Sequence, residues 1–141
     1  MSNRIKVLHD VETVVELLKG AMTTYKAVLL TGALGAGKTY LVQQWMRAIE
    51  VQDKVTSPTF SLVNIYQKDN LKIYHMDMYR LKSVEEAMGI GFMEMIDEPE
   101  GICIIEWPGL VMPMIDHDYV KIDINVDEGE RTYAITYSEM S

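Results

Sequence analysis

One stretch of the chain matches the pattern G-x-x-x-x-G-K-[ST] at every fixed position: Gly32-Ala33-Leu34-Gly35-Ala36-Gly37-Lys38-Thr39. It follows the apolar segment 27–31 and precedes a segment with helical spacing of apolar residues. Glycines let such a turn curl so that successive backbone N–H groups point inward and form a concave site for phosphate oxygens. The stretch therefore predicts a strand, a phosphate-binding turn and a helix in that order. The alternative is a glycine-rich turn that binds nothing.

Two side chains of this motif carry the chemistry expected of a nucleotide site. The ammonium group of Lys38 can reach the β and γ phosphates as a point charge, and the Thr39 hydroxyl is placed to coordinate Mg²⁺. The helix that follows presents the positive end of its dipole to the same anion. ATP and Mg²⁺ are therefore the expected ligands.

Hydrophobic periodicity predicts alternating helices and strands along the chain. Asp10 can cap a helix whose apolar positions run from Val11 to Met22, and a second helix has its apolar stripe between Leu41 and Ile49. The last two strands alternate apolar and polar residues, as an antiparallel hairpin at the edge of a sheet would. We expect strands at 27–31, 60–66, 71–77, 101–106, 119–126 and 131–137, and short helices from Ser83 to about Met88 and at 92–96.

These elements predict an α/β fold in one domain over residues 1–141. A buried strand that runs straight into a phosphate-binding turn is typical of P-loop NTPase-like folds. We therefore expect three layers, with helices on the faces of a mostly parallel central sheet whose edge strands are antiparallel. No internal repeat and no Pro-, Gly- or Ser-rich linker divides the sequence.

The charge balance argues against a stand-alone nucleic-acid binder. The chain has 141 residues with 13 Lys plus Arg against 21 Asp plus Glu, a formal charge of −8. Phosphate backbones are held mainly through Lys and Arg, so we expect no autonomous nucleic-acid binding. The longest apolar stretches, 27–30 and 102–105, are far shorter than the roughly 20 residues of a membrane-spanning helix. We expect no membrane association, no secretory signal and a cytoplasmic location.

Two acids are candidates for the carboxylate that a phosphate-binding turn needs beside its metal ion. Glu106 follows four apolar residues and precedes Trp107-Pro108, so the strand ends there and the carboxylate can face the turn. Asp77 ends the segment 71–77 in a similar way. The alternatives are an exposed acid at Glu106 and a turn residue at Asp77. His75 is expected to be structural, because Mg²⁺ prefers oxygen ligands and no zinc set lies nearby.

Three further strings sharpen this interpretation: Ser57-Pro58-Thr59-Phe60-Ser61-Leu62-Val63, His75-Met76-Asp77-Met78-Tyr79-Arg80-Leu81 and Ile105-Glu106-Trp107-Pro108. With the phosphate-binding motif, and in this order, they resemble the TsaE (YjeE) family over nearly the whole chain. The resemblance implies an ATPase of tRNA threonylcarbamoyladenosine biosynthesis. It also implies TsaB and TsaD as partners, which modify adenosine 37 of tRNAs reading codons that begin with A. The chain would then meet tRNA only through that complex.

The resemblance also implies roles for individual residues. Thr39 and Glu106 would bind Mg²⁺, Asp77 would lie near the γ-phosphate, and His9 would lie near the adenine. Lys38, Asp77 and Glu106 would be the catalytic residues. The nucleotide contacts it implies are His9, Gly32, Leu34, Gly35, Ala36, Gly37, Lys38, Thr39, Trp107 and Arg131.

The loop around Ser57 to Phe60 resembles a switch segment. Ser57 and Thr59 offer hydroxyls near the phosphates, and Pro58 stiffens the turn between them. The alternative is an ordinary structured loop. Either Glu106 or Asp77 could position the attacking water, and no arginine stands out as a finger acting within the chain. Hydrolysis by the isolated chain is therefore expected to be slow and to rise with a partner.

Two other functions are compatible with the motif. Similar phosphate-binding turns serve small-molecule kinases, which would need a second pocket with basic residues for the acceptor. Arg80 and Arg131 are the only arginines well placed for that purpose. The other possibility is a nucleotide-gated adaptor whose hydrolysis is incidental and whose partner contacts carry the function.

Overall fold

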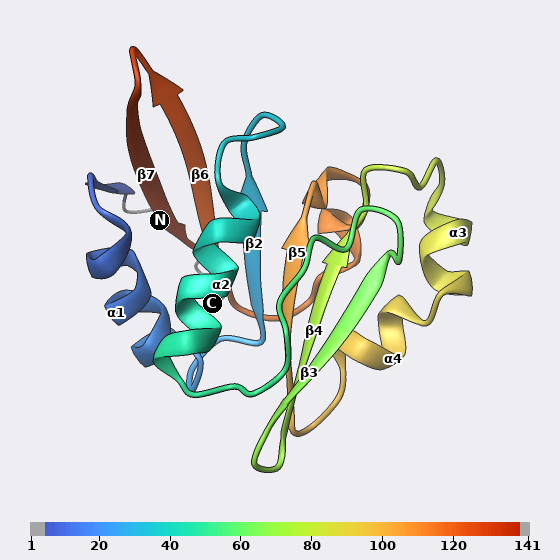
Figure 1. Ribbon diagram of the computed structural model, residues 1–141. Helices are drawn as coiled ribbons and strands as arrows, with labels where there is room; N and C mark the ends of the chain where they lie inside the picture. The colour runs from blue at the N-terminus through green and yellow to red at the C-terminus, as the bar shows by residue number, and fades with distance from the viewer. Residues whose placement is uncertain (1–4, 139–141) are drawn as a thin grey trace.

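The computed structural model describes residues 5–138, which form a seven-stranded sheet with helices on both faces (Figure 1). None of the helices in this range is long and apolar enough to span a membrane. The strands are β1 (Ile5–Leu8), β2 (Ala27–Thr31), β3 (Val63–Lys68), β4 (Leu71–Asp77), β5 (Gly101–Glu106), β6 (Tyr119–Asp127) and β7 (Glu130–Tyr137), and the helices are α1 (Val11–Ala21), α2 (Lys38–Ala48), α3 (Val84–Gly89) and α4 (Phe92–Ile96), with short 3₁₀ helices η1 (Pro108–Leu110) and η2 (Met112–Met114).

The sheet is parallel in its centre and antiparallel toward its edges. Its strand order is β1-β7-β6-β2-β5-β4-β3. β2 is parallel to both of its neighbours, β5 and β6, and β5 is parallel to β4. The outer pairs β1–β7, β7–β6 and β4–β3 are antiparallel. The prediction of an α/β fold with this kind of sheet is confirmed.

The structure corrects two details at the edges of the sheet. The β6–β7 hairpin is not an edge, because β1 pairs with β7 from Ile5↔Thr136 to Leu8↔Tyr133. We predicted no strand at 5–8, since four residues are too short to show a period of two. β3 begins at Val63 and not at residue 60, because the chain turns first: the N–H of Leu62 donates to the carbonyl of Pro58 at 2.7 Å.

Alternate residues of the central strands pack against the two helical layers. Val28 and Leu30 of β2 face the layer formed by α1 and α2, while Ala27 and Leu29 face the layer that contains α3 and α4. The apolar stripe of α2 is buried as its periodicity predicted, with Trp45 fully enclosed. This packing fixes the direction in which α2 leaves the end of β2.

The central strands β2, β5 and β4 have their carboxyl ends side by side. Leu30, near the end of β2, pairs with Glu106 at the end of β5, and Glu106 pairs with Asp77 at the end of β4. The turn between β2 and α2 therefore starts beside both acids. In parallel α/β sheets, ligands bind at the carboxyl ends of the strands, so a functional site is expected at this end of the sheet.

Candidate functional site

The turn between β2 and α2 has a backbone that only glycine fits at two positions. Gly37, the residue before α2, has φ 109°, which is the left-handed region. At Gly32, a Cβ atom would lie only 2.9 Å from the backbone oxygen of Ile124. The glycines of the motif therefore allow the chain to curl tightly into the first turn of α2, as the pattern predicted.

Lys38 is enclosed within this turn. Its side chain is 7% exposed, its Nζ atom donates to the carbonyl of Gly32, and this atom lies 4.4 Å from the centre of the Trp107 ring. Burial lowers the pKa of Lys38, and the negative charges of Glu106 and Asp77 act in the opposite direction. The ammonium group is thus held in a poorly solvated place where a further anion would stabilise its charge.

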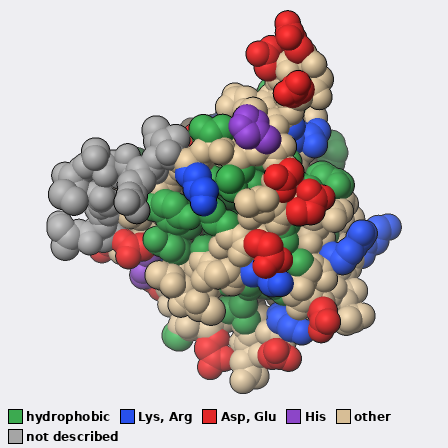
Figure 2. Space-filling view, turned by 90° about the vertical axis from the view of Figure 1, so that its left-hand side faces the viewer, with side chains coloured by type: hydrophobic (Ala, Val, Ile, Leu, Met, Phe, Trp, Pro, Cys, Tyr) green, Lys and Arg blue, Asp and Glu red, His purple; other side chains and the backbone are tan. Residues whose placement is uncertain are grey.

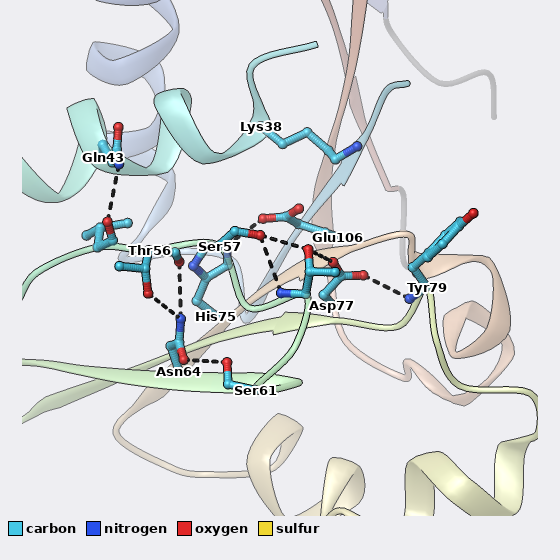
Figure 3. Close-up of polar contacts among 12 residues, drawn as sticks. Lys38, Gln43, Thr56, Ser57, Ser61, Asn64, His75, Asp77, Tyr79 and Glu106 are labelled. Atoms are coloured by element: carbon cyan, nitrogen blue, oxygen red, sulfur yellow. Dashed lines mark hydrogen bonds and ion pairs between the residues drawn. The ribbon is translucent and has the colours of Figure 1, made fainter. Parts of the chain in front are cut away.

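Both predicted acids lie beside Lys38 and are almost inaccessible to solvent. Glu106 is 3% exposed and Asp77 is 2% exposed, so the interpretation of Glu106 as an exposed acid is wrong. Asp77 accepts hydrogen bonds from the Thr59 hydroxyl at 3.0 Å and from the N–H of Tyr79 at 2.8 Å, so it also shapes the turn after β4. In Figure 3, Lys38, Asp77 and Glu106 surround the same space, although they come from three different elements.

These groups line one cleft of about 220 Å³. The glycine-rich turn and α2 contribute one wall, the loop before β3 a second, and the ends of β4 and β5 the floor. Within the cleft lining, Lys38 is the one cationic side chain. The lining residues are Leu34, Gly35, Gly37, Lys38, Thr39, Tyr40, Ser57, Thr59, Asp77, Glu106 and Trp107.

The loop predicted to be a switch segment does lie in the cleft. The Ser57 and Thr59 hydroxyls are 2.8 Å apart, and Thr59 reaches Asp77. The Arg80 guanidinium donates to the backbone carbonyls of Thr59 and Phe60, each at 3.3 Å. The loop is therefore anchored at the cleft by hydrogen bonds, and its movement as a switch stays a prediction.

His75 lies behind Glu106 and away from solvent. Its Nε2 atom is 2.6 Å from Glu106 Oε2 and its Nδ1 atom is 3.0 Å from the Tyr66 hydroxyl. Among residues 5–138, no group of three His, Cys, Asp or Glu side chains could hold a metal ion by itself. His75 is not among the residues that line the cleft, and its contact with Glu106 was not foreseen because the two residues come from different strands.

Other residues that the sequence singled out lie around the turn. Trp107, at φ 54°, lines the cleft and packs on Tyr79 with ring centres 4.9 Å apart. The Arg131 guanidinium lies behind Gly37, where a Cβ atom would come within 3.1 Å of it. His9 is exposed between β1 and α1. Neither Arg131 nor His9 lines the cleft of about 220 Å³.

A second hollow, of about 380 Å³, lies on the other side of the glycine-rich turn. It is lined by Gly32, Ala33 and Ala36, the three motif positions that do not line the first cleft. Residues Gly32–Ala36 line this hollow from one side and Ile124, Asn125 and Val126 from the other.

Tyr40 and Tyr79 lie near the first cleft and were not predicted, because an exposed tyrosine in a helix or loop has no sequence pattern of its own.

Comparisons with known proteins identify relatives of the chain. The family model for "Threonylcarbamoyl adenosine biosynthesis protein TsaE" matches residues 5–133. The tRNA threonylcarbamoyladenosine biosynthesis protein TsaE of Treponema pallidum is 40% identical over 99 residues, which is 70% of this chain and 72% of that protein. The protein of the same name from Rickettsia felis is 32% identical over 128 residues, or 89% of this chain and 74% of its own length.

A solved structure shows the same fold. The crystal structure of YdiB from Bacillus subtilis superposes with a TM-score of 0.69 at 22% identity and covers 98% of this chain and 87% of that one. The family match spans the sheet up to the first half of β7, together with the glycine-rich turn and both acids of the cleft. The chain therefore belongs to the TsaE family, whose members serve the biosynthesis of threonylcarbamoyladenosine in tRNA.

Proposed function

We propose that the chain is a Mg²⁺-dependent ATPase that acts, with TsaB and TsaD, in forming the threonylcarbamoyl group on adenosine 37 of tRNAs reading codons that begin with A. The observation that carries the ATPase proposal is the single cleft in which the phosphate-binding turn, Lys38, Thr39, Asp77 and Glu106 meet. The tRNA part of the proposal follows from the family.

The donor set of the cleft suits Mg²⁺. Thr39 supplies a hydroxyl, and Glu106 and Asp77 supply carboxylates, which are the oxygen ligands that Mg²⁺ prefers. Mg²⁺ is usually held by one or two carboxylates together with substrate phosphates, so three acidic ligands from the chain are not needed. When bound, Mg²⁺ would offset the repulsion between the phosphates and the two buried acids. Thr39 and Glu106 are the proposed ligands.

Each side chain of the cleft then has a task that its position supports. Lys38 neutralises charge on the terminal phosphate, where its poor solvation strengthens the attraction. Asp77 or Glu106 orients the attacking water. Asp77 is the acid bonded to the switch segment through Thr59, and Glu106 is the acid held by His75. We further propose Trp107, Arg131 and His9 as nucleotide contacts, with Arg131 acting from behind Gly37.

Among residues 5–138 no arginine lines the cleft, and this supports the proposed dependence on a partner. Arg80 donates to the carbonyls of Thr59 and Phe60, and Arg131 lies behind Gly37. Within residues 5–138, Lys38 is therefore the one cation that lines the cleft. An arginine finger supplied from outside a nucleotide site raises turnover by about 10³–10⁵-fold. TsaB and TsaD are the proposed source of the missing group or of the closure that completes the site.

The test is ATP turnover with Mg²⁺, measured for the chain alone and with TsaB and TsaD added. We expect slow turnover alone, strong stimulation by the partners, and loss of that stimulation in Glu106→Ala. Glu85→Ala, an exposed acid on α3, is the matched control and should behave like the wild type. Lys38→Ala should abolish hydrolysis, and an unaffected rate in that variant would contradict the assignment of the phosphate site.

The same assay separates the two other functions. Rapid turnover that ignores TsaB and TsaD would overturn the partner-gated ATPase and lead to a screen of phosphate acceptors for a kinase. The cleft lining offers little support for a kinase, since Lys38 is the one basic residue that lines it within the described part of the chain, residues 5–138. A single turnover of ATP that suffices for tRNA modification, with no partner-dependent cycling, would instead indicate a nucleotide-gated adaptor.

A further inference from the structure

A line of buried side chains runs from the floor of the cleft into the sheet. Glu106 contacts His75 at 2.6 Å, and His75 contacts the Tyr66 hydroxyl at 3.0 Å. His75 is 0% exposed and Tyr66 is 2% exposed, so solvent does not compete for these hydrogen bonds. The three residues lie on three neighbouring strands, β5, β4 and β3, which hold them at fixed spacing.

One set of hydrogen-bond directions follows when Glu106 is taken as a carboxylate and His75 as a neutral ring. An ionised carboxylate only accepts, so the Nε2–H of His75 donates to Glu106 Oε2. With a neutral ring, Nδ1 has a lone pair, and we assign the single proton of the Tyr66 hydroxyl to it because Nδ1 lies at 3.0 Å whereas the Thr56 carbonyl, the other acceptor, lies at 3.4 Å. Tyr66 thereby selects the tautomer of His75 and orients its ring. The ring in turn sets the position of one oxygen of Glu106.

The second carboxylate oxygen of Glu106, Oε1, differs from Oε2 in its hydrogen bonding. Among residues 5–138, His75 provides the only side-chain hydrogen bond to Glu106, and it goes to Oε2. Oε1 is left for a ligand in the cleft. A carboxylate held through one oxygen by an ordered imidazole keeps a defined orientation, which lowers the cost of ordering it when a cation binds.

The line ends at the loop that forms the second wall of the cleft. The Tyr66 hydroxyl also lies 3.4 Å from the carbonyl of Thr56, and Asn64 donates to the same carbonyl at 3.1 Å. Thr56 directly precedes Ser57. In Figure 3, Thr56 and Asn64 lie on the far side of His75 from Lys38. The loop that reaches Asp77 through Thr59 is thus also in contact with the residues behind Glu106.

We propose that His75, held in one tautomer by Tyr66, is a positioning residue that sets the Glu106 carboxylate for the divalent cation. This inference rests on the proposed function, because it concerns the Mg²⁺ of that site. A merely structural histidine would contribute to stability and leave the response to Mg²⁺ unchanged. A positioning histidine makes the response to Mg²⁺ depend on its own hydrogen bonds and on those of Tyr66.

The test compares two tyrosines of the same sheet. Tyr66→Phe removes the hydroxyl that orients His75, and Tyr74→Phe, the matched control, removes a part-buried hydroxyl that donates to Glu98 at 3.3 Å on the opposite face of β4. Calorimetry with a non-hydrolysable ATP analogue gives the affinity in EDTA and over a series of Mg²⁺ concentrations. His75→Leu and His75→Gln are measured in parallel, and urea unfolding reports their stability.

We expect all variants that fold to bind the analogue in EDTA like the wild type. His75→Leu should need about tenfold more Mg²⁺ for half of the Mg²⁺ effect, since loss of a group that orients a metal ligand costs about 10–100-fold in metal affinity. Tyr66→Phe should shift in the same direction by a few-fold, and His75→Gln, which can donate from a similar position, should recover part of the loss. Tyr74→Phe should not shift.

Two results would overturn the inference, and they can be told apart. If the wild type binds Mg²⁺ and the analogue but Tyr66→Phe responds to Mg²⁺ like Tyr74→Phe, then His75 is structural and the proposed function stands. If the wild type shows no Mg²⁺-dependent binding at all, the proposed function fails, and the inference fails with it. Because Tyr66→Phe changes one hydroxyl only, this comparison decides the matter even if both His75 variants unfold.

Discussion

At Gly37 the backbone and a neighbouring side chain both disfavour any other residue. The φ of 109° strains a residue with a Cβ atom, and that atom would lie 3.1 Å from the Arg131 guanidinium. Since the guanidinium can move, the backbone strain is the larger part of the cost, about 1–3 kcal/mol. We predict that Gly37→Ala lowers the free energy of unfolding by this amount and weakens nucleotide binding, as urea unfolding and calorimetry would measure.

The control for this prediction is Gly20→Ala. Gly20 lies within α1, and a Cβ atom there would meet nothing within 4 Å. Replacing a glycine by alanine inside a helix is favourable by roughly 0.5–1 kcal/mol, so this variant should be more stable than the wild type. If both variants lost stability equally, the strain at Gly37 would not explain its loss.

Burial makes the single cysteine unreactive. Cys103 lies within β5 and is fully buried, and desolvation raises the pKa of its thiol to about 12. We predict that the native chain does not react with Ellman's reagent at pH 8, whereas the chain unfolded in urea reacts with one equivalent. The raised pKa of the thiol also makes the stability of the fold depend on pH. The contribution of the neutral thiol is complete below the ordinary pKa of about 9 and is lost as pH rises toward 12. A fast native reaction would contradict this burial.

The sequence identified the polar groups of the cleft but not all of their contacts. Lys38 and Thr39 belong to a continuous motif, and Asp77 and Glu106 each end an apolar strand, so local spacing was enough to select them. The contact between His75 and Glu106 joins residues that are 31 positions apart. It depends on which strands pair and in what register, and the local pattern of neither strand contains that information.

At the level of elements, α3 shows how a local signal fixes the start of a helix. The Ser83 hydroxyl accepts from the N–H of Glu86 at 3.1 Å, and the Glu86 carboxylate accepts from the N–H of Lys82 at 2.5 Å. We predict that Ser83→Ala costs about 1 kcal/mol of stability, because an N–H of the first turn loses its partner. Urea unfolding measures this, and a change below about 0.3 kcal/mol would show that water replaces the cap without cost.

Elements whose own residues show a clear hydrophobic pattern were predicted well. Elements that depend on a neighbouring strand or turn were not. α1 and the strands β2, β4 and β5 have clear periodicity or apolar runs, and their bounds agree with the structure to within one residue. β1 has four residues and exists because β7 offers it a partner. The start of β3 depends on the turn closed by the Leu62 N–H, which tertiary contacts with Asp77 support.

On the scale of the whole molecule, the surface carries far more negative than positive charge. The face in Figure 2 has its basic side chains scattered among acidic ones, and its protruding tip is acidic. That tip is the exposed turn of the β6–β7 hairpin, which extends beyond the rest of the sheet in Figure 1. It contains Asp127, Glu128 and Glu130. Among the side chains drawn in colour on that face, this distribution leaves no continuous basic stripe with which to follow a phosphate backbone.

The charge leads to a prediction about the order of assembly. With a formal charge of −8, the chain is repelled by tRNA at long range, and few of its cations could release counterions on contact. We predict that the isolated chain binds a tRNA reading a codon that begins with A more weakly than about 10⁻⁴ M, the weak end of non-specific affinities. Mobility-shift titrations at low and physiological salt would measure this affinity for the chain alone and with TsaB and TsaD.

Binding by the chain alone that weakens steeply with salt would reveal a basic surface and contradict the view that partners hold the tRNA. Binding that requires the partners would agree with a division of labour in which they hold the tRNA and this chain contributes its nucleotide cleft, where the phosphate-binding turn and the two buried acids lie.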